Sequence, residues 1–159
     1  MIGTGTLDVT TPTEREIVMA RRFDAARERV FDALTRPELL ERWYAAPGWS
    51  LAACEIDFRV GGAWRFVSRN REGAQMVQCG RYREIVPPER VVFTESWEGW
   101  DQGEILVTTV LADEEGGTGF RTALLFPSRG ARDAARNAGM ERGAAQVYDK
   151  LAEFLASGS

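Results

Sequence analysis

The sequence contains no histidine, and Lys150 is its single lysine. The lack of histidine excludes the commonest general base, a very common metal ligand and every catalytic triad built on an imidazole. All other basic residues are arginines, which are spread along the chain and mixed with acidic residues, and the formal net charge is −4. This distribution is typical of a solvated surface and does not favour nucleic-acid binding.

Cysteine and long apolar runs are also scarce. Cys54 and Cys79 do not form a CxxC motif and lie in apolar, strand-like segments, so we expect buried structural thiols. The apolar runs are far too short to span a membrane. The N-terminal sequence MIGTGTLDVTTPTE lacks the basic and apolar regions of a signal peptide. These features predict a cytoplasmic protein without membrane insertion, metal or cofactor.

The residues that are present suffice for one ordinary domain. The chain has 159 residues, of which 44% are hydrophobic. A chain of this length can bury roughly 70% of the surface that its unfolded form exposes, and it needs no disulfide or metal to fold. Residues 1–13 are rich in threonine and glycine and are expected to form a flexible arm, with a single domain over residues 14–156.

The domain is expected to start with a strand and two short helices. β-Branched and polar residues mix over residues 14–23, which predicts a strand. Asp24 stands where a helix N-cap belongs before residues 25–35, in which Ala26, Val30, Ala33 and Leu34 fall on one helical face. Thr35 and Glu38 have capping-box spacing around Pro37, so a second short helix is expected over residues 37–44.

The pattern then changes from helical to twofold. Turn sequences such as NREG and PPER separate six strand candidates, at residues 51–58, 63–69, 76–86, 91–98, 104–112 and 119–126. Short connections make antiparallel neighbours. A short helical turn is expected at residues 128–137. One apolar stripe then predicts a long C-terminal helix, with Met140, Ala144, Val147, Leu151 and Phe154 on it.

The order β-α-α-β6-α predicts an α+β fold. A curved antiparallel sheet of about seven strands is expected to wrap around the long C-terminal helix, and the two small helices to close one end.

Gly61 and Gly62 raise the question of a phosphate-binding loop. Such a loop leads from a strand into a helix, whereas these glycines lie between two strand candidates. We therefore expect a hairpin turn in which the glycines supply positive φ values. The alternation after the turn directs Trp64 and Phe66 to one face of the sheet.

That face is expected to look toward the long helix. Two interpretations stay open: these side chains form a closed core, or they leave a ligand cavity with apolar walls and a few polar anchors. Gly143, beside the apolar stripe, would allow either close packing or space over a ligand. The other residues expected on the inner face are Tyr82, Phe93, Trp97 and Phe120, together with the polar Ser68, Gln78 and Glu84.

Four segments carry a resemblance to a known family: FDAARERVFDALTRPELLERWY, CEIDFRVGGAWRF, GRYREIVPPERVVFTESW and GMERGAAQVYDKLAEFL. They resemble the START and Bet v-like (SRPBCC) superfamily, in the branch named after the C-terminal domain of the activator of the heat-shock protein 90 ATPase. The resemblance runs from about Glu14 to Leu155 and implies the helix-grip fold. Many members have a tryptophan where this chain has Ala144, and this difference enlarges any cavity.

The resemblance implies binding of a hydrophobic small molecule between the long helix and the sheet. Two alternatives stay open. One is an enzyme of cyclase or hydrolase type acting on such a ligand, with Glu84, Glu95 or Tyr82 as acid or base, although the sequence has no recognisable catalytic motif. The other is a co-chaperone that stimulates a heat-shock protein 90 type ATPase. Thirteen residues before the first strand are too few for the separate chaperone-binding domain of the eukaryotic activator.

We expect the cavity to be lined mainly by aromatic residues, with Trp100 shaping its entrance. A homodimer is left open. The full set of expected lining residues is Trp43, Trp64, Phe66, Tyr82, Trp97, Trp100, Met140, Val147 and Tyr148.

Overall fold

The computed structural model describes residues 7–157 and contains one open antiparallel sheet. The eight strands lie in the order β1-β2-β8-β7-β6-β5-β4-β3. Six of them, β3 to β8, follow one another as a meander. The strands are β1 (Asp8–Thr10), β2 (Glu16–Phe23), β3 (Trp49–Ile56), β4 (Ala63–Asn70), β5 (Gln75–Val86), β6 (Arg90–Trp97), β7 (Ile105–Glu114) and β8 (Gly117–Leu125).

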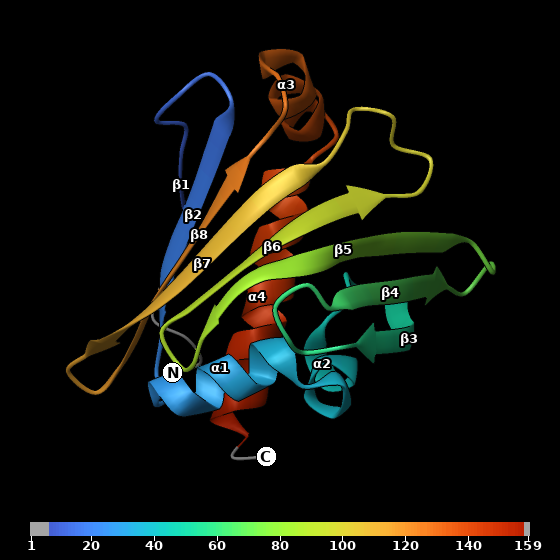
Figure 1. Ribbon diagram of the computed structural model, residues 1–159. Helices are drawn as coiled ribbons and strands as arrows, with labels where there is room; N and C mark the ends of the chain where they lie inside the picture. The colour runs from blue at the N-terminus through green and yellow to red at the C-terminus, as the bar shows by residue number, and fades with distance from the viewer. Residues whose placement is uncertain (1–6, 158–159) are drawn as a thin grey trace.

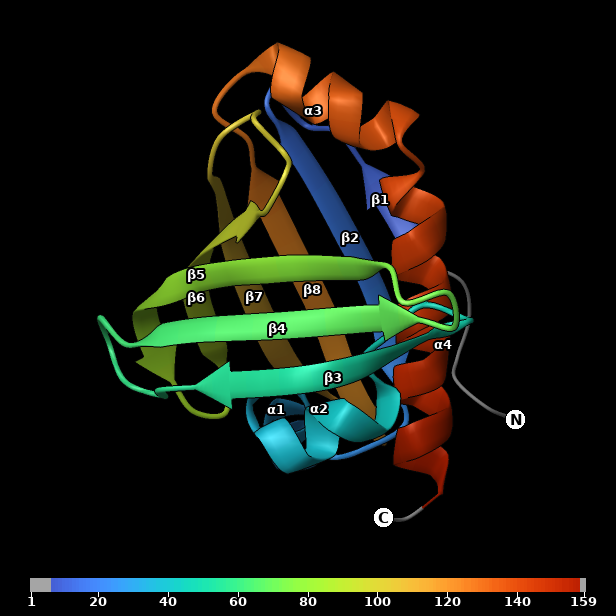
Figure 2. The same ribbon diagram turned by 90° about the vertical axis from the view of Figure 1, so that its right-hand side faces the viewer.

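The sheet curves around the long C-terminal helix, as expected from the sequence. The helices are α1 (Arg27–Thr35), α2 (Pro37–Trp43), α3 (Arg129–Asn137) and α4 (Met140–Ala156). The helix α4 runs along the inner side of the sheet, α1 and α2 close one end, and α3 lies at the other end (Figures 1 and 2). The predicted α+β fold with a long C-terminal helix is therefore confirmed. None of these helices is both long and apolar enough to cross a membrane.

The start of the chain differs from the expectation. Within the arm expected at residues 1–13, Asp8–Thr10 form β1, an edge strand paired with Val18–Ala20 of β2. Residues 1–6 of that arm lie outside the described residues. The sheet thus has one strand more than the expected seven. Without β1, the strand β2 would be an edge strand, and its unpaired backbone N–H and C=O groups can form hydrogen bonds with an extended segment beside it.

Both predicted helix caps are wrong. The helix α1 begins at Arg27 with Ala26 at its N-cap and no capping side chain, while the Asp24 carboxylate lies 3.6 Å from Nε of Arg22. Thr35 is the last residue of α1, and its hydroxyl donates to the carbonyl of Phe31 at 2.7 Å. That bond lies within α1, and Arg36, between the two helices, takes the N-cap position of α2 without a capping side chain.

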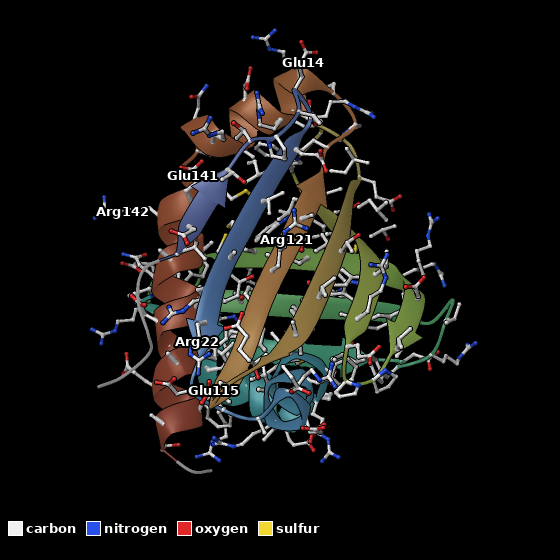
Figure 3. The ribbon with its side chains drawn as sticks, turned by 90° about the vertical axis from the view of Figure 1, so that its left-hand side faces the viewer. Glu14, Arg22, Glu115, Arg121, Glu141 and Arg142 are labelled. Atoms are coloured by element: carbon white, nitrogen blue, oxygen red, sulfur yellow. The ribbon has the colours of Figure 1, made fainter. Side chains whose placement is uncertain are left out.

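The outer face of the sheet is polar and charged. Arg121 is exposed on the outer side of β8 (Figure 3). At the turn between β7 and β8, Arg22 donates to the carboxylate of Glu114 at 3.0 Å and to the carbonyl of Glu115 at 2.7 Å. The two clusters of buried apolar residues lie on the inner face, between sheet and helices.

Candidate ligand-binding site

The inner face of α4 divides into two parts that differ in burial. We call Met140–Tyr148 the open half and Leu151–Leu155 the closed half. Leu151 is 0% exposed and Leu155 4% exposed, whereas the apolar side chains of the open half all keep accessible surface. The closed half packs into the core cluster that also contains Trp43 of α2. The inner side of α4 is therefore fully covered along only part of its length.

A carboxyl group lies on the inner face of the sheet beside the open half. Glu95 of β6 lies opposite Ile105 of β7, which is 3% exposed and belongs to the inner core. Nε1 of Trp97, two residues further along the same strand, donates to Oε2 of Glu95 at 2.8 Å. Burial raises the pKa of the Glu95 carboxyl, and the hydrogen bond from Trp97 opposes that rise only in part.

Three more polar side chains converge on this carboxyl. Gln78 of β5 is 3% exposed, and its Nε2 donates to the hydroxyl of Tyr44, just after α2, at 2.9 Å. Tyr148 of α4 packs its ring against Phe120 with 4.9 Å between centroids. Burial, followed by the charge of Glu95, raises the pKa of both tyrosine hydroxyls, so both lie within reach of its field. We call Glu95, Tyr44, Gln78 and Tyr148 the polar cluster.

Four of the expected lining residues are instead buried core. The indole of Trp43 donates to the carbonyl of Ala33 at 2.9 Å and joins the two short helices. The indole of Trp64 donates to the carbonyl of Thr94 at 3.2 Å and fixes β4 against β6. Phe66 and Tyr82 are 7% and 5% exposed. All four side chains belong to the buried core cluster that also contains Leu151.

The other five expected lining residues are only half-buried. Trp100, in the connection between β6 and β7, contacts the core cluster that also includes Met140 and Tyr148. Trp97 donates its indole hydrogen bond to Glu95. Val147 packs against the core cluster that contains Leu151. Three of these five residues, Met140, Val147 and Tyr148, belong to the open half of α4 itself.

The position of Glu84 contradicts the prediction for the inner face. A β-bulge between Tyr82 and Glu84 shifts the register of β5 by one residue, so Ile85 rather than Glu84 packs on the inner core. Glu84 pairs with Arg90, and both side chains are nearly half exposed. Gln78 and Ser68 do lie on the inner face, as predicted, and are buried.

Tyr44 and the cysteines also differ from the sequence analysis. Tyr44 was not named as a lining residue, and its position directly after a short helix gave no periodic signal. Cys54 and Cys79 are unpaired thiols and only half-buried, whereas the sequence analysis expected buried thiols. Burial, with a smaller contribution from Glu41, raises the pKa of Cys54 to about 12, which makes it a poor nucleophile.

The double glycine is a hairpin turn, as predicted. The N–H of Gly61 donates to the carbonyl of Tyr82 at 2.8 Å, and that of Gly62 to Arg59 at 2.8 Å, so neither is available to a phosphate. Only Gly61 has a positive φ, of 86°. Gly62 is required for another reason, because a Cβ there would lie 2.0 Å from the carbonyl oxygen of Asp57.

A separate hollow lies on the surface between α3 and the start of α4. Its volume is about 380 Å³, and it is lined by Asp133, Arg136, Asn137 and Glu141. Nε of Arg136 donates to Glu141 at 2.7 Å across it. These polar walls are unsuited to a hydrophobic molecule, and the hollow is open to solvent.

An open antiparallel sheet that wraps around a C-terminal helix, with two short helices after the first long strand, is the helix-grip fold. The chain belongs to the family described as "Activator of Hsp90 ATPase homolog 1-like protein", which matches residues 24–156. That family is a branch of the SRPBCC superfamily, as the sequence motifs implied. No curated protein matches the chain.

Solved structures agree with this assignment. A protein of Rhodobacter sphaeroides is 31% identical, with a TM-score of 0.92, over 96% of this chain and 99% of the other. An AHSA1-like protein from Aeromonas hydrophila is 21% identical, with a TM-score of 0.73, over 90% and 93% of the two chains. A protein from Mycobacterium smegmatis is 17% identical, with a TM-score of 0.85, over 95% and 97%. The last two show the fold alone.

Proposed function

We propose that the protein binds a hydrophobic small molecule between the open half of α4 and the inner face of the sheet. One observation carries this proposal: the inner side of α4 is fully buried at Leu151 and Leu155 but keeps accessible surface from Met140 to Tyr148. Apolar and aromatic walls with a few convergent polar groups are the usual composition of small-molecule sites.

Two small residues support the presence of space at the open half. Ala144 places only a methyl group on the apolar stripe, and a Cβ added at Gly143 would meet no atom within 4 Å. Gly143 is therefore not explained by close packing against a neighbouring element. A glycine inside a helix costs about 1 kcal/mol of helix stability relative to alanine.

Filling the open half tests the proposal. Ala144→Trp places an indole on the inner face of α4, whereas Gln146→Trp places the same indole on its exposed side. The uncharged probe N-phenyl-1-naphthylamine, followed by its fluorescence, should bind wild type and Gln146→Trp alike and Ala144→Trp at least tenfold more weakly. Equal binding by all three proteins, with folding intact, would place the probe elsewhere and contradict the proposal.

The natural ligand can be sought directly. Native mass spectrometry of the protein purified from its own host, compared with the denatured mass, should show a small-molecule adduct that survives mild activation. The same preparation of Ala144→Trp should lack the adduct, because its site is filled.

A second function, catalysis on that ligand, is favoured by the polar cluster. Glu95 is an inward carboxyl with a raised pKa, and such groups serve as general acids or bases. Incubation of the extracted ligand with wild type and with Glu95→Gln, analysed by mass spectrometry, separates the two functions. A product formed by wild type alone supports catalysis, and an unchanged ligand in both supports binding. Stimulation of a heat-shock protein 90 ATPase stays a prediction from the family resemblance.

A further inference from the structure

The two oxygens of Glu95 differ in their surroundings. Oε2 accepts the hydrogen bond from the indole of Trp97, and an indole N–H can only donate. In the neutral carboxyl group, Oε2 is therefore the carbonyl oxygen and the proton resides on Oε1. No other side chain between residues 7 and 157 bonds to Oε1, so its O–H is an uncommitted donor.

The hydroxyl of Tyr148 is a second uncommitted donor. Its ring is held against Phe120, but no hydrogen bond within the described chain uses its hydroxyl. Among the described residues, the fully occluded side-chain atoms without a partner are Nε of Arg21 and Nε of Arg27. The unpartnered atoms of Glu95 and Tyr148 are not occluded in this way and keep contact with accessible space.

The surroundings of Glu95 favour its neutral form. Within residues 7–157, no arginine or lysine lies within ion-pair distance of this carboxyl. The titratable groups that face it are Tyr44, from the end of α2, and Tyr148, from α4, and both are uncharged at neutral pH. Gln78 of β5 and Ile105 of β7 supply no charge. A buried carboxylate without a counter-ion is costly, and protonation removes that cost.

We propose that the ligand is uncharged and presents a carbonyl oxygen that accepts hydrogen bonds from Oε1–H of Glu95 and from the hydroxyl of Tyr148. This inference rests on the proposed binding function and specifies its ligand class, a hydrophobic ketone or related carbonyl compound. A carboxylic acid that an apolar site keeps neutral is an effective donor to such an oxygen. A cationic amine would instead require the ionised carboxylate, which the surroundings disfavour.

Three probes of one shape test the ligand class: 2-acetylnaphthalene, 2-ethylnaphthalene and 1-(2-naphthyl)ethylamine. Isothermal titration calorimetry at neutral pH should show the ketone binding about tenfold more tightly than the hydrocarbon, which is the effect of one or two hydrogen bonds. The amine should bind more weakly than the ketone. Tyr148→Phe should lower the affinity for the ketone and so remove most of its advantage over the hydrocarbon.

Glu95→Gln provides the matched test of protonation. Its amide oxygen still accepts from Trp97, and its NH₂ replaces the carboxyl O–H as donor, so ketone affinity should be retained. In wild type, the advantage of the ketone should be full at low pH and should fall as the pH rises through the raised pKa of Glu95. In Glu95→Gln, that advantage should not change with pH. If Glu95→Gln does not fold, the ketone and hydrocarbon affinities of wild type and Tyr148→Phe still test the inference.

The outcomes separate this inference from the function on which it rests. Equal affinity for ketone and hydrocarbon, or tighter binding of the amine with loss in Glu95→Gln, overturns the carbonyl inference while leaving hydrophobic binding in place. Failure of wild type to bind any of the three probes overturns both.

Discussion

The closed and open halves of α4 face the same sheet, but they pack against different core clusters, and only the closed half is fully buried there. The helix α4 contacts α1 and α2, and Trp43 of α2 belongs to the same buried cluster as Leu151 and Phe154. Met140, Ala144 and Tyr148 of the open half instead pack, only partly buried, against the second core cluster, to which α3 contributes Ala131 and Ala135. Trp100, from the connection between β6 and β7, packs against the same cluster.

This difference shows how one amphipathic helix can serve both the fold and the site. Hydrophobic burial of the closed half anchors the helix and contributes to stability in proportion to the apolar area covered. The open half then needs to contribute less to stability, and it can tolerate small residues and polar neighbours. A site that is incompletely packed depends on a closed region elsewhere in the same element.

The largest expected difference between the halves is in their sensitivity to truncation. Leu151→Ala should reduce the free energy of unfolding by about 2–5 kcal/mol, because Leu151 is fully buried. Met140→Ala, on the same stripe but partly exposed, should cost less than about 1 kcal/mol. Urea denaturation followed by far-UV circular dichroism measures both values.

Similar losses in the two variants would contradict the comparison. They would mean that the open half is packed as tightly as the closed half, and that the accessible surface at Met140 is too shallow to admit a ligand. If Leu151→Ala lowers the free energy of unfolding as expected and Met140→Ala lowers it only slightly, the space available to a ligand lies at the open half.

The sequence predicted the fold well because the fold follows from periodicity. The twofold pattern located both ends of each of the six later strands to within two residues, and the apolar stripe located α4. The stripe did not reveal the two halves, because Met140, Val147 and Leu151 have the same spacing in either environment. Coverage by α1 and α2 is a property of tertiary packing, which no single segment encodes.

The polar cluster was only partly predictable. Glu95 was named among three candidate acids or bases. The alternation of residues along the strands, however, also predicted Glu84 on the inner face. A β-bulge at Tyr82 and Glu84 decides between them, and a bulge adds one residue without a strong sequence signal. Tyr44 was missed because its approach to Gln78 joins residues from two distant segments.

Glu95 should impose a pH dependence on stability that its replacement removes. Its pKa is raised in the folded protein, so the folded state binds the proton more tightly than the unfolded state does. Its contribution is fully present below the unfolded pKa and is lost as the pH rises through the folded pKa, by up to about 1.4 kcal/mol per pH unit. Glu95→Gln should lack this loss, which urea denaturation at a series of pH values would show.

An exposed carboxylate of α4 supplies the control. Glu153→Gln removes a charge from the solvent side of the closed half and should retain the wild-type pH dependence. If Glu95→Gln and wild type respond to pH alike, Glu95 is solvated rather than enclosed, and the open half offers no low-dielectric site.

The smallest expected effect is a gain in stability at the open half. Gly143→Ala should raise the free energy of unfolding by about 0.5–1 kcal/mol, because alanine favours the helix and its Cβ would meet no atom within 4 Å. Gly80→Ala is the matched contrast, since a Cβ there would lie 1.7 Å from the carbonyl oxygen of Thr94 and must disturb the pairing of β5 with β6. Thermal denaturation of both variants measures the difference. A loss of stability in Gly143→Ala would show that a close neighbour requires the glycine, and the space assigned to a ligand beside α4 would shrink accordingly.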